Sequence, residues 1–305
     1  MRNRRIAILT RWGGGFGSGH IQRMAGLLWH AYRCGGTRMY LWHDTVPDFF
    51  PAELAPLVIA QPDAAPDCIV RDMRDSTRLE IESLRALCPV CVVDDFGEGR
   101  AVADYRVDLL PPPSLPISPS DLGAADGFLY GYTFIRGLES MRGAAIAKTI
   151  DYALYPGADP DGGYVRFMVS LLPGDACHAV FQGDDSYVER NGVRKKFVAD
   201  DYARVLLSSK AVISHFGITL YEARAAKCEI ITINPTQYHS MLADAAPSLG
   251  IRNCGVAGSL SVEHARDVIQ RTADCAPFCS VLVDDVAAEV LKHLDRIYQY
   301  LRNIA

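Results

Sequence analysis

The stretch that decides the fold is Arg5-Ile-Ala-Ile-Leu-Thr10, with the segment that follows it, Gly13-Gly-Gly-Phe-Gly-Ser-Gly-His-Ile-Gln-Arg23. The first part is a short apolar run, as expected for a buried parallel strand. From residue 20 to residue 32 the apolar side chains recur at helical spacing. A strand, a glycine-rich loop and a helix in this order predict the first βα unit of an α/β sheet.

The same alternation continues to about residue 110. Short apolar runs predict strands at 39–42, 68–70 and 90–93, and the pattern over 76–87 predicts a helix. A stretch rich in Pro, Ser and Gly then begins at Pro111. We therefore expect a first Rossmann-like domain over residues 1–140.

The alternation restarts after this break. Strands are predicted at 152–155, 179–181, 211–214 and 230–233, and helices at 165–172, 201–209, 219–226, 237–249 and 261–272. A second α/β domain is expected over 150–283, followed by a long helix over 284–305 that packs back on the domains. The predicted fold class is α/β, with two Rossmann-like domains that face each other across a cleft. Because open α/β sheets bind ligands outside the carboxyl ends of their strands, functional residues are expected there.

Composition limits the classes of function. The chain has 305 residues and a formal charge of −5, so it lacks the basic excess typical of nucleic-acid binding. No apolar run is long enough for membrane insertion. We expect a cytoplasmic monomer. The nine cysteines are an odd number in a large chain, and the pairs Cys88/Cys91 and Cys275/Cys279 differ in spacing, so ordinary reduced thiols are expected.

The glycine loop is the sharpest local motif. Five of residues 13–19 are glycines, which allow close approach of the backbone, and the helix that follows presents free N–H groups to an anion. The loop lacks the Lys-Ser/Thr ending of a P-loop and does not fit G-x-G-x-x-G, which disfavours an ATPase or a standard NAD site. A merely permissive turn is the alternative. We expect a loop that contacts phosphate or substrate through these residues: Gly15, Gly17, Ser18, Gly19 and Arg23.

A histidine and two aspartates are the candidate catalytic residues. His20 follows the loop, where an imidazole could act as a general base, or could merely cap the helix. Asp72 and Asp95 follow predicted strands, where a carboxylate could orient a base or merely form a turn. No metal-ligand spacing such as H-E-x-x-H occurs, so no metal and no cofactor are expected.

A second glycine turn starts a helix in the second half of the chain. Gly217, Ile218 and Thr219 would again offer N–H groups to a phosphate. Glu222 could grip ribose hydroxyls, or could reach back to Thr219 as a capping-box partner.

The order of these motifs resembles a known family. Besides Phe16-Gly-x-Gly-His-Ile-x-Arg23, it includes Val93-Asp-Asp95, Gly131-Tyr-Thr-Phe-Ile-Arg136, Pro156-Gly-Ala-Asp159 and Asn234-Pro-Thr-Gln-Tyr-His239. The chain is similar to the UDP-sugar hydrolases of pseudaminic acid biosynthesis and the related spore-coat polysaccharide biosynthesis proteins. The likeness runs over roughly residues 5–250, and the first motif is its most specific part.

The resemblance implies a GT-B glycosyltransferase-like fold and a nucleotide-sugar hydrolase of surface glycan biosynthesis. His20 would activate water and release UDP from a modified amino or deoxy sugar. The second domain would hold the nucleotide through these residues: Gly157, Gly217, Ile218, Thr219, Glu222 and Gln237. Two alternatives stay open, a GT-B glycosyltransferase that moves the sugar to an acceptor and an inactive sugar-nucleotide-binding protein.

Overall fold

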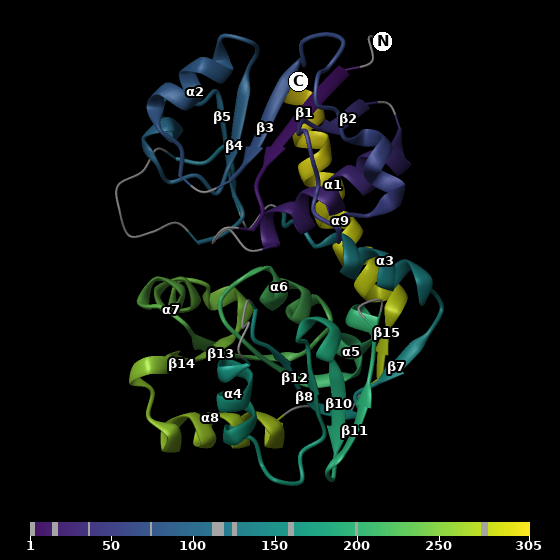
Figure 1. The fold of residues 1–305 in the computed structure, drawn as a ribbon, viewed down its shortest axis with the longest axis vertical. Helices are drawn as coiled ribbons and strands as arrows, with labels where there is room; N and C mark the ends of the chain where they lie inside the picture. Colours follow the sequence, from purple (N-terminus) through teal and green to yellow (C-terminus); the bar gives the residue numbers. More distant parts are fainter. Residues whose placement is uncertain are drawn as a thin grey trace. The chain divides into compact units, whose positions relative to one another are not determined.

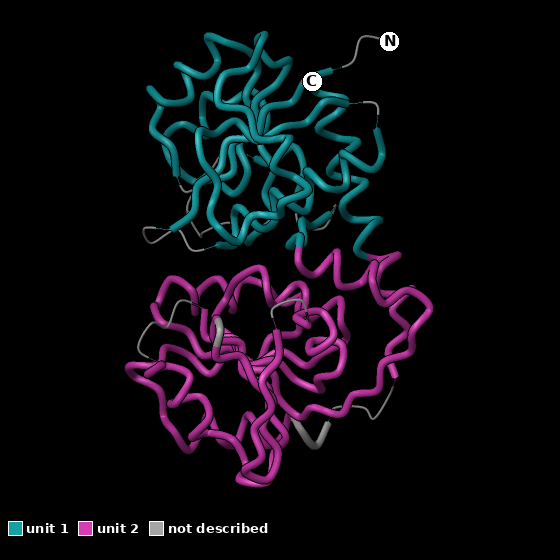
Figure 2. The backbone as a smooth tube through the Cα atoms, turned by 45° about the vertical axis from the view of Figure 1, so that its right-hand side comes forward, with its two compact units in different colours: residues 1–132, 290–305 teal, residues 133–289 magenta. Residues whose placement is uncertain are grey.

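The computed structural model describes residues 4–13, 18–35, 37–73, 75–111, 119–123, 127–157, 162–198, 201–275 and 280–305. The chain forms two compact units (Figure 2): unit 1 comprises residues 1–132 and 290–305, and unit 2 comprises residues 133–289. The expected domain limits at residues 140 and 150 both fall inside unit 2.

Unit 1 is built on a six-stranded sheet in the order β2-β1-β3-β4-β5-β6, and every pair is parallel. The strands are β1 (Arg4–Thr10), β2 (Thr37–Leu41), β3 (Cys68–Asp72), β4 (Val90–Val93), β5 (Tyr105–Asp108) and β6 (Leu122–Gly123). Its helices are α1 (Gly19–Cys34), α2 (Arg78–Arg85), the 3₁₀ turns η1 (Ala52–Leu57) and η2 (Glu98–Val102), and residues 290–304 of α9 (Val283–Ile304). Figure 1 shows this strand–helix alternation in chain order.

The short apolar runs of unit 1 are strands because both faces of the sheet are covered. Ala7, Ile69 and Val92 lie in one buried cluster with Ile81 of α2. Ile6 and Ile8, which point to the opposite face by strand alternation, are also fully buried.

Unit 2 contains a seven-stranded sheet in the order β11-β10-β9-β8-β12-β13-β14. Five strands run parallel: β8 (Ile150–Tyr155), β9 (His178–Val180), β12 (Ser209–Ser214), β13 (Glu229–Asn234) and β14 (Ile251–Val256). A separate antiparallel pair joins β7 (Ala145–Ala147) to β15 (Ser280–Leu282). The helices and 3₁₀ turns are α3 (Tyr132–Ser140), which begins at the last residue of unit 1, α4 (Gly163–Leu171), η3 (Gly183–Asp185), α5 (Tyr202–Ser208), α6 (Ile218–Ala225), α7 (Gln237–Asp244), η5 (Pro247–Leu249), η6 (Ala257–Ser259) and α8 (Val262–Cys275).

The mixed α/β class with parallel Rossmann-like sheets is confirmed, but several elements were not predicted. They include α3 and the strands β5, β6, β7, β14 and β15. A β-hairpin, β10 (Tyr187–Arg190) with β11 (Val193–Lys196), adds two antiparallel strands that we did not predict. Its turn is Asn191-Gly192, with φ of 50° and 75°, the pair that a tight hairpin favours. The helix predicted over 237–249 ends at Asp244, and a 3₁₀ turn follows at Pro247, since proline disfavours helical geometry in the residue before it.

Among the described helices, none is both long enough and apolar enough to span a membrane.

Candidate functional site

The carboxyl edge of the unit 1 sheet gathers the candidate catalytic residues. In the register of the sheet Thr10 pairs with Asp72, and Asp72 pairs with Val93. The strands β1, β3 and β4 therefore end side by side. Helix α1 begins at Gly19, so His20 lies in its first turn.

His20 and Asp72 form a hydrogen-bonded pair. Nδ1 of His20 lies 2.8 Å from Oδ1 of Asp72, whose carboxylate is fully buried, while the imidazole is 19% exposed. Burial would raise the pKa of Asp72, but Arg23 and His20 outweigh burial and lower the pKa to about 2. An ionised Asp72 can only accept a hydrogen bond, so Nδ1–H donates to it, and a neutral imidazole then has its lone pair on Nε2. Among the described residues, none bonds to that Nε2.

Arg23 fixes the buried side of this pair. It lies three residues after His20, on the same face of α1. Its Nε donates to Oδ2 of Asp72 at 2.7 Å, its Nη2 also donates to Asp72, and its Nη1 donates to Asp94 at 2.6 Å. Burial opposes the charge of Arg23, but Asp72 and Asp94 raise its pKa above the ordinary value. The guanidinium, expected from the sequence to contact phosphate or substrate, is instead buried in these ion pairs.

Asp94 joins His20, Arg23 and Asp72, and these four residues form what we call the unit 1 cluster. The backbone of Asp94 has a φ of 49°, in the left-handed region, and its Oδ1 accepts from the N–H groups of Leu109 and Leu110 at 2.7 and 2.8 Å. Burial raises the pKa of Asp94, although Arg23 and the Leu110 N–H oppose that shift. The sequence analysis did not select this residue.

Asp95, which we expected beside His20, lies in a different cluster. Its carboxylate accepts from Arg71 and from the N–H groups of Ser76 and Gly97, each at 3.0 Å. These contacts hold the turn after β4, which is the turn-forming alternative weighed from the sequence.

The structure describes only part of the glycine loop. Gly15 and Gly17 lie outside the described residues. Ser18 is exposed and precedes α1, and its carbonyl accepts the N–H of Gln22 at 3.0 Å. Gly19 is half-buried at the first position of the helix.

The carboxyl edge of the unit 2 sheet holds a close approach between Gly157 and His215. Gly157 has a φ of +70°, and a Cβ on it would lie 2.2 Å from Nε2 of His215. Burial lowers the pKa of His215, although the Phe216 carbonyl opposes the shift. The rings of His215 and His239 pack edge to face, with their centroids 5.6 Å apart. Because any Cβ at position 157 would overlap the His215 ring, this turn requires glycine. The turn that we expected at Gly157 thus lies at the carboxyl edge of the sheet.

Glu222 is not available on the surface of unit 2. It is 3% exposed, and the hydroxyl of Tyr202 donates to its Oε2 and lies 3.4 Å from Oγ1 of Thr219. Thr219 stands inside the first turn of α6, after the N-cap Gly217, so the capping-box alternative is not formed. Burial and Glu222 raise the pKa of Tyr155, on the neighbouring strand end, to about 12.

The remaining predicted residues of this edge are more exposed to solvent than Glu222. Gly217 and Ile218 are half-buried at the start of α6. Gln237 is exposed at the first position of α7, where the preceding Thr236 accepts the N–H of His239 at 3.4 Å.

Comparisons with known proteins support the fold. No protein-family model matches the chain, and no curated protein matches it in sequence. The glycosyltransferase of kitacinnamycin is similar in structure at a TM-score of 0.61 and 11% identity, over 100% of both chains. The spinosyn rhamnosyltransferase SpnG, complexed with thymidine diphosphate, gives a TM-score of 0.57 at 12% identity over 98% of this chain and 99% of that one. The UDP-GlcNAc 2-epimerase from Neisseria meningitidis, bound to UDP-GlcNAc, gives 0.54 at 8% identity over 99% of both chains.

At these identities the likeness establishes the fold alone. The chain has the GT-B fold that glycosyltransferases and UDP-GlcNAc 2-epimerases share. The finer resemblance to sugar hydrolases of pseudaminic acid and spore-coat pathways finds no support among these structures.

Proposed function

We propose that the chain is a glycosyltransferase that uses a nucleotide sugar, with His20 as its general base. The observation that carries this proposal is the contact between Nδ1 of His20 and Oδ1 of the buried Asp72 at 2.8 Å. No described residue bonds to Nε2 of His20, so this atom can accept a proton. The likeness in fold to the two glycosyltransferases supports the same class of reaction.

The proposed reaction is a single displacement. Nε2 of His20 takes the proton of an acceptor hydroxyl, and the acceptor oxygen attacks the anomeric carbon. The bond from that carbon to the diphosphate oxygen breaks, and the electron pair leaves with the nucleoside diphosphate. Asp72 stays ionised and stabilises the imidazolium that forms, while Arg23 holds Asp72 in position.

The proposed nucleotide site is the carboxyl edge of the unit 2 sheet. The N–H groups that start α6 after Gly217 suit a diphosphate. The turn of Gly157 beside His215 would lie next to it. The buried Glu222 would act there through Tyr202 rather than by gripping ribose itself. Uridine and thymidine diphosphates are the first candidates, because two structurally similar proteins are complexed with thymidine diphosphate and bound to UDP-GlcNAc, respectively.

The test uses the purified full chain with a panel of UDP- and TDP-sugars. Release of nucleoside diphosphate is measured with and without a panel of hydroxyl acceptors. We expect release to depend on an acceptor. We expect His20→Ala to lower kcat by on the order of 10²-fold or more for a lost base, while His264→Ala, an exposed histidine on α8, serves as the matched control and keeps the rate.

Each other outcome is also decisive. Release that is equally fast without any acceptor would assign hydrolysis, with water as the acceptor, in place of transfer. Conversion of UDP-GlcNAc into its 2-epimer would assign the epimerase reaction instead. Nucleotide binding without turnover on any sugar would favour an inactive binding protein, and a His20→Ala variant as active as wild type would refute the role of His20.

A further inference from the structure

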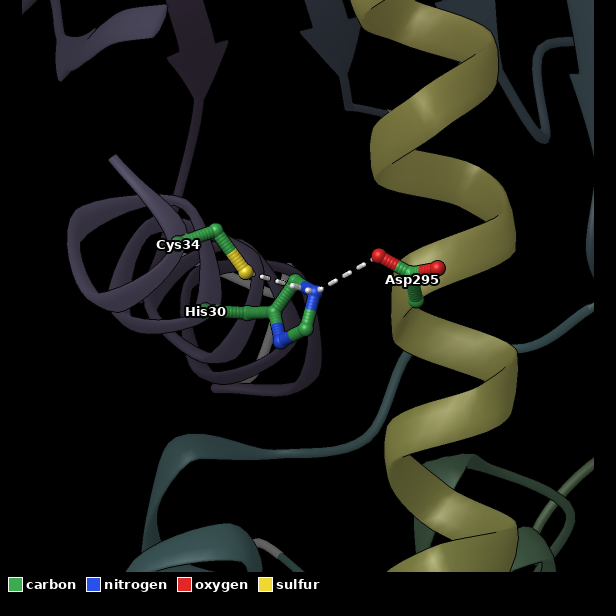
Figure 3. A group of neighbouring side chains, drawn as sticks. All are labelled: His30, Cys34 and Asp295. Carbon is green, nitrogen blue, oxygen red and sulfur yellow. Dashed lines mark hydrogen bonds and ion pairs between the residues drawn. The ribbon is translucent and has the colours of Figure 1, made fainter. Parts of the chain in front are cut away.

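Three side chains with different donor atoms meet at the far end of α1. His30 and Cys34 lie one turn apart near the C-terminal end of this helix, and Asp295 projects towards them from α9 (Figure 3). Nε2 of His30 is 3.5 Å from Sγ of Cys34 and 3.6 Å from Oδ1 of Asp295. All three donor atoms lie within 4.8 Å of one another.

Both distances fit the ligands of a shared cation, although 3.5 Å is also an ordinary length for a hydrogen bond to sulfur. At 3.6 Å the contact of His30 with Asp295 is longer than a hydrogen bond. A tetrahedral zinc ion, with bonds of about 2.0–2.3 Å, would hold its ligand nitrogen and sulfur roughly 3.5 Å apart and its ligand nitrogen and oxygen roughly 3.4 Å apart. One Nε2 atom thus faces two electron-rich atoms at about the separations that a metal ion requires.

The two helices are fixed where the cluster forms. The hydroxyl of Tyr298, one turn after Asp295, donates a hydrogen bond to the carbonyl of Gly35 at 2.9 Å. The rings of Tyr298 and His30 pack edge to face, with their centroids 5.6 Å apart. His30 is buried, whereas Cys34 and Asp295 are exposed, so solvent reaches the cluster from one side. Oδ1 of Asp295 also accepts from Gln299 at 3.3 Å, a contact that leaves a further lone pair for a metal.

We propose that His30, Cys34 and Asp295 form a binding site for one zinc ion that joins α1 to α9. An imidazole, a thiolate and a carboxylate are the ligand types that zinc takes in proteins. On binding, Nε2 gives its lone pair, the Cys34 thiol loses its proton to solvent, and water fills the fourth position.

The site is separate from the chemistry proposed at His20. Cys34 lies at the opposite end of α1, roughly 21 Å away along the helix axis at 1.5 Å per residue. Its effect would be to hold the C-terminal helix on unit 1. The sequence analysis expected no metal, because no spacing such as H-E-x-x-H occurs. The pair His30-x-x-x-Cys34 is a weak signal by itself, since its third ligand lies 261 positions further on.

Cobalt is the probe, because Co²⁺ takes zinc positions and reports a thiolate ligand through its charge-transfer band. The reduced full chain, freed of metal, is titrated with Co²⁺ alone. We expect one equivalent to produce the thiolate-to-cobalt band together with visible bands of tetrahedral cobalt, and Zn²⁺ to remove them. Cys34→Ser should abolish the charge-transfer band. Cys88→Ser, which changes a half-exposed thiol outside the cluster, should leave it intact.

Two further variants and a second readout guard against misfolding. His30→Gln and Asp295→Asn should weaken the apparent affinity by at least about tenfold, as loss of even an outer partner does at metal sites. Zn²⁺ should raise the melting temperature of wild type and of Cys88→Ser but not of Cys34→Ser. No charge-transfer band in wild type, or a band that persists in Cys34→Ser, would overturn the proposal, whatever the outcome of the glycosyltransferase assay.

Discussion

Replacing Asp72 by Asn tests the carboxylate that bonds to both His20 and Arg23. The substitution keeps the shape of the side chain and an oxygen opposite Nδ1 of His20, but it removes the charge. Arg23 then keeps only one ionised partner, Asp94, at 2.6 Å. His20 loses the carboxylate that would stabilise its protonated form. Stability and catalysis should both fall, each for its own reason.

The size of each effect follows from the geometry. The pKa of Asp72 is lowered to about 2 in the fold, and against an ordinary value near 4 this corresponds to on the order of 2 kcal/mol of stability. Breaking a buried ion pair costs about 3–5 kcal/mol when no partner remains. Because Arg23 retains Asp94, we expect a loss of about 2–3 kcal/mol in the free energy of unfolding. For kcat we expect a fall of roughly 10²–10⁴-fold, since the same change in a Ser-His-Asp triad costs up to about 10⁴.

The assay is urea unfolding together with kcat on the best sugar donor and acceptor. Asp108→Asn is the matched control, because Asp108 is also buried and paired with an arginine, Arg100, at 2.7 and 2.8 Å. It should lose a similar amount of stability but keep kcat within about threefold, less than 1 kcal/mol of barrier. If Asp72→Asn kept kcat as well as Asp108→Asn does, the pairing of His20 with Asp72 would have no part in the reaction.

Three further predictions follow from single contacts. Because the pKa of Asp72 is lowered, its contribution to stability should be complete above about pH 4 and be lost as the pH falls towards 2. The urea midpoint of wild type should show this loss between about pH 4 and 2, and the midpoint of Asp72→Asn should not. Asp95→Asn should lower the free energy of unfolding by on the order of 2 kcal/mol while kcat stays within about threefold; a loss of kcat as large as that of Asp72→Asn would return Asp95 to the catalytic set. Gly157→Ala, at a φ of +70° and with a Cβ 2.2 Å from His215, should destabilise unit 2 by about 1–3 kcal/mol and reduce the rise in melting temperature that UDP or TDP causes; an unchanged rise would remove this turn from the nucleotide site.

The sequence predicts those strands of the two sheets that are buried on both faces. Runs such as residues 68–70 and 211–213 are apolar throughout, and few structures other than parallel strands bury so short a run so completely. The hairpin of β10 and β11 lacks this signal, since Val193 to Lys196 are all exposed at the sheet edge. Its one cue is Asn191-Gly192, which a search for turn residues would have found.

The site is less predictable because it depends on contacts across the fold. His20 and Asp72 were each a candidate, but their contact depends on the register of β1 and β3 and on where α1 begins. Asp94 and Asp95 are equivalent by sequence. The left-handed φ of Asp94 breaks the alternation at the end of β4, so Asp94 joins Arg23 and Asp95 turns to Arg71. The bond from Tyr202 to Glu222 joins two helices and leaves no local pattern.

The charges of the unit 1 cluster support the proposed role of His20 as a base. With both carboxylates ionised, Asp72 and Asp94 carry two negative charges, and Arg23 carries one positive charge. A neutral His20 therefore leaves an excess of one negative charge in a buried setting, where charge interactions are strong. Taking a proton on Nε2 brings the sum to zero. In the proposed reaction the proton taken on Nε2 would lie beside the ionised Asp72, while Arg23 and the N–H groups of Leu109 and Leu110 hold the two carboxylates in place.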